Sequence, residues 1–271
     1  MTLCLSVPVL MTGAILNAVG ILIGSVLGLM LERQFSAGVQ VQLRKGLAVL
    51  TILAGMHLVW LGLIVPNFPL HKVGDAGLHS VLSGWLASGY HILKGMVIIL
   101  FAMILGRFTG QLLRIQSTLN RLGHWAGQRF ASARADDPNR LNDGFLICTL
   151  LFCAGPLGPI GVVEDGLLGN WETLAIKMLM DGLAAMGFVG IYGWGVALSA
   201  IPVLVFEGTL TLAVHHLEPL ARTHQLLDSV NTMSGFLVMS VALVILELKK
   251  VQLADYLPSL FMAPLITWLL R

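Results

Sequence analysis

The sequence is poor in charged residues, which excludes an ordinary soluble domain. Only 11% of its 271 residues are charged, whereas 56% are hydrophobic; a usual soluble protein has about 25% charged residues. The mean hydropathy of +0.86 agrees with this bias. So little polar side-chain surface cannot cover a water-soluble core of this size, and we therefore predict a membrane protein.

Motifs that position catalytic or cofactor-binding groups are absent as well. The sequence contains no HExxH, no GxSxG, no Walker loop and no dinucleotide fingerprint. Its three cysteines, Cys4, Cys148 and Cys153, form no CxxC pair and lie in or beside apolar segments. Cysteines in such surroundings are usually buried, unreactive thiols. We therefore expect no enzyme, no cofactor and no metal site.

Apolar runs of helix length are what the sequence has in abundance. Crossing a hydrocarbon core of about 30 Å takes about 20 apolar residues. We predict an all-α, polytopic transmembrane helical bundle of about seven or eight spans, several short enough to be tilted, broken or re-entrant. An amphipathic segment at 76–90 fits the membrane surface instead. The apolar runs lie near 12–31, 46–65, 92–112, 143–160, 173–190, 195–216, 231–248 and 254–270.

The first run lacks the features of a cleaved signal peptide. No basic segment precedes it, and it continues as a helix-length span without a small-residue cleavage site. We expect it to remain in the mature protein. Met11 is an alternative start, because the ten residues before it add nothing that the helix needs.

Lysine and arginine placement predicts the orientation of the spans. If every run crosses, three basic loops fall on one side, which the positive-inside rule assigns to the cytoplasm. Both termini would then lie outside the cytoplasm of a bacterial inner membrane. The loop at 113–142 is interpreted as a basic, mobile cytoplasmic loop, and no nucleic-acid partner is expected. The basic residues are Arg33, Arg44 and Lys45; Arg114, Arg121, Arg129, Arg134 and Arg140; and Lys249 and Lys250.

Two blocks of three spans share a layout that suggests an inverted repeat. The N-terminal block, 1–112, and the C-terminal block, 195–271, each open with a helix ending in a glutamate, and an offset that aligns Glu32 with Glu218 relates them. The second block would cross in the opposite sense to the first, as in many transporters. Between them lies 143–194, with a broken helix and a charged helix, and all belong to one membrane domain. Chance similarity between apolar segments is the alternative.

The first span carries small residues on one face and a single amide. Gly20, Gly24 and Gly28 recur at four-residue spacing, which lets two helix backbones approach closely in a membrane. We interpret them as packing residues. Asn17 lies one turn before Gly20, and its amide is a candidate for ligand contact or for a structural hydrogen bond to another helix.

The stretch "CAGPLGPIGVVEDGLLGN" predicts a break in the fourth span. Prolines remove backbone donors and glycines loosen a helix, so carbonyl groups should be freed at membrane depth. Glu164 and Asp165 follow directly. Two carboxylates beside free carbonyls form a candidate cation or proton site; a solvated loop is the alternative. The residues expected to break the helix are Gly155, Pro156, Gly158, Pro159 and Gly161.

The fifth span holds a lysine and an aspartate in an otherwise apolar sequence. Lys177 and Asp181 are four residues apart, so they share one helix face and can pair. An unpaired charge at bilayer depth costs at least about 2.5 kcal/mol, and intramembrane ionisable residues are functional candidates by default. A structural ion pair is the alternative. The order, lysine first, is the less favourable one for a plain helix-stabilising pair, which favours a binding role.

A further carboxylate lies in the sixth span. Glu207 follows Pro202 and precedes Gly208 within an apolar run. A membrane-embedded carboxylate near a kink fits proton or cation coupling, with a hydrogen bond to a neighbouring helix as the alternative. His57, alone in "LAGMHLVWLG", is interpreted as a packing residue.

Four stretches together resemble a known family. They are "TGAILNAVGILIGSVLGLMLE", "LLFCAGPLGPIGVVEDGLLGNWETLAIKMLMDGLAAMGF", "GVALSAIPVLVFEGTLTLA" and "YLPSLFMAPLI". They resemble the bacterial membrane proteins of domain of unknown function 554, the YqgA/YdfK-like family, over nearly the whole chain. The resemblance implies a multi-helix inner-membrane protein of a kind often assigned to transport, and it implies no particular substrate.

These features favour an ion-coupled secondary transporter of a small solute. Its site would combine Asn17, the broken stretch, Lys177, Asp181 and Glu207, with Asp181 and Glu207 as carboxylates that couple transport to H⁺ or Na⁺. A structural or regulatory module is the alternative from another class, with the glycine face as a contact of a homo-oligomer. An ion channel is a third reading. Beyond the lipid bilayer, the sequence identifies no partner.

Overall fold

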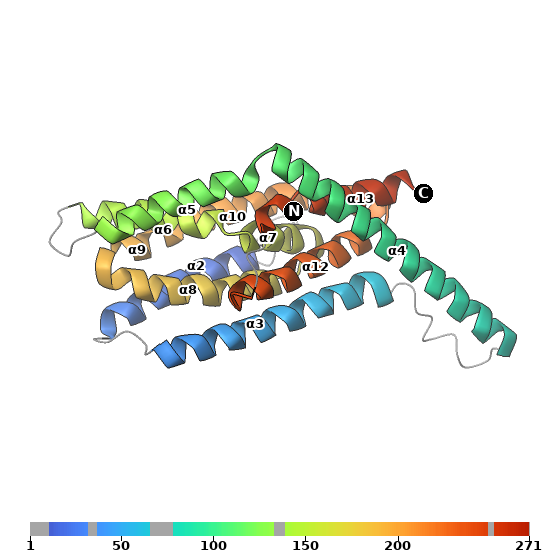
Figure 1. The fold of residues 1–271 in the computed structure, drawn as a ribbon, viewed down its shortest axis with the longest axis horizontal. Coiled ribbons are helices and arrows are strands. Elements are labelled where there is room, and N and C mark those ends of the chain that lie inside the picture. The colour runs from blue at the N-terminus through green and yellow to red at the C-terminus, as the bar shows by residue number, and fades with distance from the viewer. Residues whose placement is uncertain (1–10, 32–36, 66–77, 133–138, 249–251, 271) are drawn as a thin grey trace, which may run out of the picture.

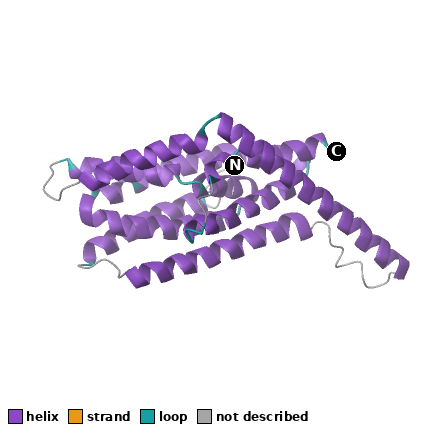
Figure 2. Cartoon of the chain, in the orientation of Figure 1, coloured by secondary structure: helices purple, strands orange, loops and turns teal. Residues whose placement is uncertain are grey.

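Helices make up the protein, as predicted. The computed structural model describes residues 11–31, 37–65, 78–132, 139–248 and 252–270, and in these ranges it contains helices and turns but no strand (Figures 1 and 2). The prediction of an all-α membrane protein is therefore confirmed. The elements are α2 (Thr12–Met30), α3 (Ala37–Val59), η1 (Trp60–Ile64), α4 (Leu78–Leu112), α5 (Ile115–Ser132), α6 (Arg140–Ala154), α7 (Leu157–Leu168), α8 (Glu172–Tyr192), α9 (Gly195–Leu198), α10 (Ala200–His215), α11 (Glu218–Thr223), α12 (Leu227–Ile245), η4 (Leu253–Tyr256) and α13 (Ser259–Leu269).

The predicted spans correspond closely to these helices. Within the described residues, six helices are long and apolar enough to cross a membrane, and α6 with α7 forms a seventh if that bent pair counts as one span. The eighth apolar run, 254–270, forms η4 and α13 instead. The 11 residues of α13 extend only about 16 Å, which is too short to cross unaided.

Two segments differ from their predicted form. The expected loop at 113–142 contains the helix α5, on which Ile115, Leu119, Leu122 and Ala126 recur at helical spacing. The basic residues of α5 lower its mean hydropathy, so a search for spans missed it. Residues 133–138, with Arg134, lie outside the described residues. At 78–90, the predicted surface segment is continuous with the third span, and Figure 1 shows this part of α4 extending away from the other helices.

Glycine faces bring the central helices together. A Cβ atom on Gly24 of α2 would collide with the backbone of Gly182 of α8, and one on Gly20 would collide with Met178. A Cβ atom on Gly28 would likewise collide with the backbone of Met186 of α8. Close backbone approach of this kind compensates for the missing hydrophobic drive between helices in lipid. The α2–α8 contact fixes the register of Asn17 against the charged face of α8.

Candidate functional site

The site begins at the break in the fourth span. Helix α6 ends at Ala154, Gly155 is extended (φ −61°, ψ 138°), and α7 begins at Leu157, with a bend of 60° between the two helices. In an uninterrupted helix, the carbonyl of Phe152 would accept a hydrogen bond from residue 156. Pro156 has no N–H group, so the carbonyl of Phe152 is left free for another donor.

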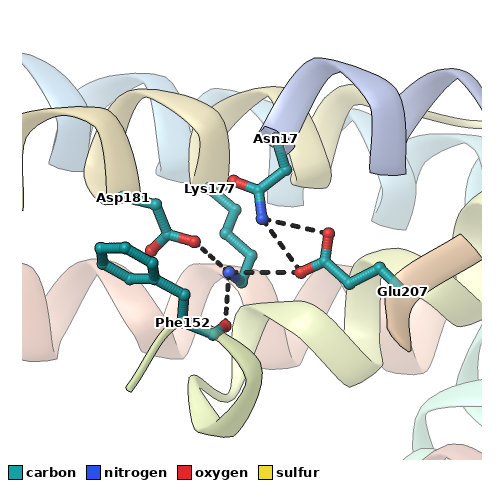
Figure 3. A network of polar contacts seen from close by, with 5 residues as sticks. All are labelled: Asn17, Phe152, Lys177, Asp181 and Glu207. Atoms are coloured by element: carbon teal, nitrogen blue, oxygen red, sulfur yellow. Dashed lines mark hydrogen bonds and ion pairs between the residues drawn. The ribbon is translucent and has the colours of Figure 1, made fainter. Parts of the chain in front are cut away.

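Lys177 of α8 supplies that donor. Its ammonium donates to the Phe152 carbonyl oxygen at 2.7 Å and forms ion pairs with Asp181 and with Glu207, the latter at 3.3 Å (Figure 3). The Lys177 side chain is only 2% exposed. Three acceptors therefore surround a group that has three N–H donors, and the ammonium is fully satisfied at a buried position.

Asn17 completes the group from α2. Its side-chain Nδ2 lies 3.0 Å from each oxygen of Glu207, to which it donates. The amide oxygen of Asn17 is buried and has no hydrogen-bond partner among the described residues. We call Asn17, the Phe152 carbonyl, Lys177, Asp181 and Glu207 the Lys177 cluster. Its members come from α2, α6, α8 and α10 (Figure 3).

The charges of the Lys177 cluster do not cancel. One lysine lies between two carboxylates, and the remaining contacts come from a neutral amide and a neutral carbonyl. A buried ion pair is stable only where its desolvation is offset by good geometry and further hydrogen bonds. The arrangement therefore has capacity for one more positive charge, which a proton, a metal cation or a cationic solute group would supply.

A cavity of about 610 Å³ leads to this cluster. It is lined by Lys177 and Asp181, by Gly155 and Pro156 at the helix break, and by polar side chains of α5. Its rim includes the exposed ion pair of Arg44 with Glu247. Asp181 is 14% exposed, against 1% for Glu207, so the aspartate is the carboxylate nearer to the cavity.

Glu164 and Asp165 lie outside the Lys177 cluster. Both are buried within α7, so the alternative of a solvated loop is wrong; the chain stays helical until Gly169, whose positive φ of 66° ends α7. Glu164 Oε2 accepts a hydrogen bond from the Thr173 hydroxyl at 2.7 Å, and Asp165 Oδ2 accepts one from the Gly13 backbone N–H at 3.2 Å.

The carboxyls of Glu164 and Asp165 are offset from the Lys177 cluster by about one helical turn. Gly13 precedes Asn17 by four residues on α2, and Thr173 precedes Lys177 by four residues on α8. We call Glu164 and Asp165 the α7 carboxyl pair.

Of the expected helix-breaking residues, Gly155 and Pro156 form the break itself, whereas Gly158, Pro159 and Gly161 lie within α7. Pro159 is in its first turn, where a missing N–H group removes no intrahelical hydrogen bond.

Sequence reasoning missed some contributors and misjudged His57. The Phe152 carbonyl was not predicted as a member of the site, although a proline four residues later signals a free carbonyl. The Thr173 hydroxyl had no such signal. His57, predicted to pack inside, is half exposed because its face of α3 points out of the bundle, and its Nδ1 lies 3.2 Å from Glu172 Oε2.

Cys148 is buried and Cys153 half-buried, both as free thiols; Cys4 lies outside the described residues.

The helices and the buried cluster define a polytopic α-helical membrane protein with charged groups in its interior. The chain belongs to the family described as protein of unknown function DUF554, whose profile matches residues 12–268. It is similar to "Uncharacterized membrane protein YdfK" of Bacillus subtilis (strain 168), with 26% identity over 197 residues that cover 72% of this chain and 81% of the relative. It is also similar to "Uncharacterized protein YqgA" of Escherichia coli (strain K12), with 23% identity over 252 residues, or 93% and 94% of the two chains. No solved structure gives a significant match to the chain.

Proposed function

We propose that the protein is a secondary transporter of a small solute in the bacterial inner membrane, with the Lys177 cluster as its binding site. The observation that carries this proposal is the cavity of about 610 Å³ that leads to Lys177 and Asp181. Ionisable residues at membrane depth that line a cavity mark substrate and ion pathways. Transporter sites commonly combine such residues with a broken helix near the middle of the membrane, as α6 and α7 do here.

The basic residues orient this cavity towards the cytoplasm. Arg44 on its rim belongs to the loops and helix ends that the positive-inside rule assigns to that side. The conformation is then open inward, and both chain termini lie outside the cytoplasm. In the outward-open state, the same cluster would be reached from the other face.

Helix contacts support an inverted repeat. The repeat makes α2, α3 and α4 equivalent to α10, α12 and α13, and each helix packs against its equivalent. Where α3 crosses α12, a Cβ on Gly55 would meet the carbonyl of Gly235, and a Cβ on Gly235 would meet the carbonyl of Gly55. Reciprocal contacts of this kind are expected across a two-fold axis. Rocking of one block against the other is the motion by which such repeats alternate access.

The charge balance supports coupling to a cation. Asp181 and Glu207 share a single lysine, so one carboxyl takes up H⁺ or Na⁺ when no substrate is bound. Lys177 either holds Asp181 in one state or moves to meet an anionic group of the solute. Because Asp181 is nearer to the cavity, we assign it the first exchange with the inner solution.

Uptake into proteoliposomes tests this function. A panel of labelled small metabolites and inorganic ions should contain a solute whose uptake is saturable and driven by a proton or sodium gradient. Asp181→Asn should abolish that uptake, whereas Glu247→Gln, on the exposed rim, should retain it. Ion currents without saturation would indicate a channel instead.

A non-transporting module is the second candidate, because all three N–H donors of Lys177 already have acceptors. Folded protein that moves no member of the panel under any gradient would favour this module.

A further inference from the structure

Glu164 is a buried carboxyl with incomplete hydrogen bonding. Its Oε2 accepts the Thr173 hydroxyl, whereas its Oε1 has no hydrogen-bond partner among the described residues. Ser234 of α12 lies beside the same carboxyl. The Ser234 hydroxyl is also fully buried and also lacks a partner of ordinary geometry in the described part of the chain. The Glu164 carboxyl of α7 and the Ser234 hydroxyl of α12 are therefore neighbours that each carry an oxygen atom without a partner among the described residues.

No positive charge balances Glu164 within the described ranges. Arg222 pairs with Glu218, Lys177 is occupied by its own cluster, and His215 faces the Gly166 carbonyl at 3.2 Å. An ionised carboxylate without a positively charged partner at this depth would carry a desolvation cost that proteins normally avoid by neutralising the group. Asp165 is the other titratable group of α7 itself. The titratable groups on the helices that pack against α7 are Arg140, Asp143, Cys148 and Cys153 of α6; Glu172, Lys177, Asp181 and Tyr192 of α8; Glu207 and His215 of α10; Glu218 and Arg222 of α11; and Asp228 of α12.

A proton fits this site better than a metal cation. Hard cations take about six or more oxygen ligands, and among the described residues the side-chain hydrogen-bonding partners of Glu164 are Thr173 and Ser234. The backbone carbonyls around Ser234 lie within the regular helix α12. A proton would instead neutralise the carboxyl that no cation balances, and the contact with the Ser234 hydroxyl can be made with either group donating.

A second cavity lies about one helical turn from this carboxyl, since its lining includes Leu168 of α7 and Asn231 of α12. It has a volume of about 440 Å³ and is lined by His57, Leu61, Asn170, Glu172 and Asp228, among others. Glu172 directly precedes Thr173, the residue that donates to Glu164. The second cavity meets α3 near its C-terminal end and α12 near its start, whereas the cavity at Lys177 meets the opposite ends of both helices. The two cavities therefore face opposite sides of the bundle.

We infer that Glu164, held by Thr173 and Ser234, is a proton-binding site that exchanges with the second cavity. Its use as the coupling site for transport rests on the function proposed above, whereas its protonation does not. The protein then has two separate carboxyl sites, one reached from each side. A proton entering from the second cavity would bind Glu164 about one helical turn from the Lys177 cluster.

Infrared spectroscopy of the full-length protein tests the protonation. The spectrum of wild type minus that of Glu164→Gln, both at neutral pH, should contain one protonated carboxylic-acid C=O band. The control variant Glu247→Gln, at an exposed position on the rim of the other cavity, should leave that band in place. A carboxylate band in the Glu164→Gln difference would overturn the inference, as would a sodium-dependent loss of the acid band in wild type. Neither reading requires transport, so the proton site and the transport function can fail independently.

Deuterium exchange of the same band tests the route. Leu61→Trp, which fills the second cavity, should slow exchange several-fold, whereas Leu119→Trp in the cavity at Lys177 should leave the rate unchanged. The opposite pattern, or equal slowing by both variants, would show that the proton does not arrive through the second cavity.

Discussion

The Lys177 cluster and the α7 carboxyl pair lie about one helical turn apart and stabilise their carboxyls by different means. In the Lys177 cluster, a lysine ammonium contacts two carboxylates, and a cavity reaches the edge of the group. In the α7 carboxyl pair, the contacts are a threonine hydroxyl and a backbone N–H group. Both regions are buried by the same helices, α2, α7 and α8, so burial alone does not explain the difference.

The charge of the contacting groups separates the two regions. In the Lys177 cluster, which borders the cavity of about 610 Å³, the carboxylates are held by an opposite charge. In the α7 carboxyl pair, Glu164 is buried between α7, α8 and α12, and neutral donors suffice if this group carries a proton. The same helix α7 thus presents its broken start to a charged site and its second half to a neutral one.

Removing the lysine should give the largest effect and separate the two regions. Lys177→Met leaves Asp181 and Glu207 buried without their cation, and breaking a buried pair in this way costs about 3–5 kcal/mol. Glu164→Gln replaces a neutral acid by a neutral amide and should cost about 1 kcal/mol or less, near the net value of one hydrogen bond. Denaturant unfolding in mild detergent measures both free energies of unfolding.

Equal costs for these two variants would contradict the contrast between a charged and a neutral region. In that case, Glu164 would be ionised and held by a cation. Adding Asp181→Asn to Lys177→Met should recover part of the lost stability, because one of the two unbalanced carboxylates is removed.

Restoring the backbone donor at the break should give a smaller effect. Pro156→Ala supplies an N–H group that competes with Lys177 for the Phe152 carbonyl. A double-mutant cycle with Lys177→Met should then give a coupling of about 1 kcal/mol, within the range for residues that share a partner. Pro159→Ala is the matched control, since that proline lies within α7 and contributes nothing to Phe152; its coupling to Lys177 should be near zero. A coupling of the same size for both prolines would mean that the break does not hold the lysine.

Much of the fold follows from local patterns in the sequence. Apolar runs predict the spans, Gly155 and Pro156 predict the break, and the spacing of Lys177 and Asp181 predicts that they share a face. The amphipathic helix α5 was missed because its hydropathy is too low for a span. Its role in lining the cavity depends on its position against α6 and η4, which no local pattern specifies.

The assembly of the site depends on contacts between distant segments. Asn17 and Glu207 are 190 residues apart in the sequence, and their hydrogen bonds depend on the packing of α2 against α8 and α10. The sequence placed Glu164 and Asp165 with Lys177 because all follow the same break. Once α7 continues as a helix, its rotation and length direct these two carboxyls towards Thr173 and Gly13 instead.

The central claim, that the Lys177 cluster binds a transported solute, is tested most directly by ligand-dependent thermal stability. Wild type, Asp181→Asn and the rim control Glu247→Gln are purified and melted in the presence of a panel of ions and small metabolites. A ligand of the folded state should stabilise wild type and Glu247→Gln by about 2.7 kcal/mol at a hundredfold excess over its dissociation constant, and should leave the folded Asp181→Asn variant unshifted. If no solute shifts wild type and Asp181→Asn merely melts earlier, the cluster is a structural ion pair and the claim is contradicted.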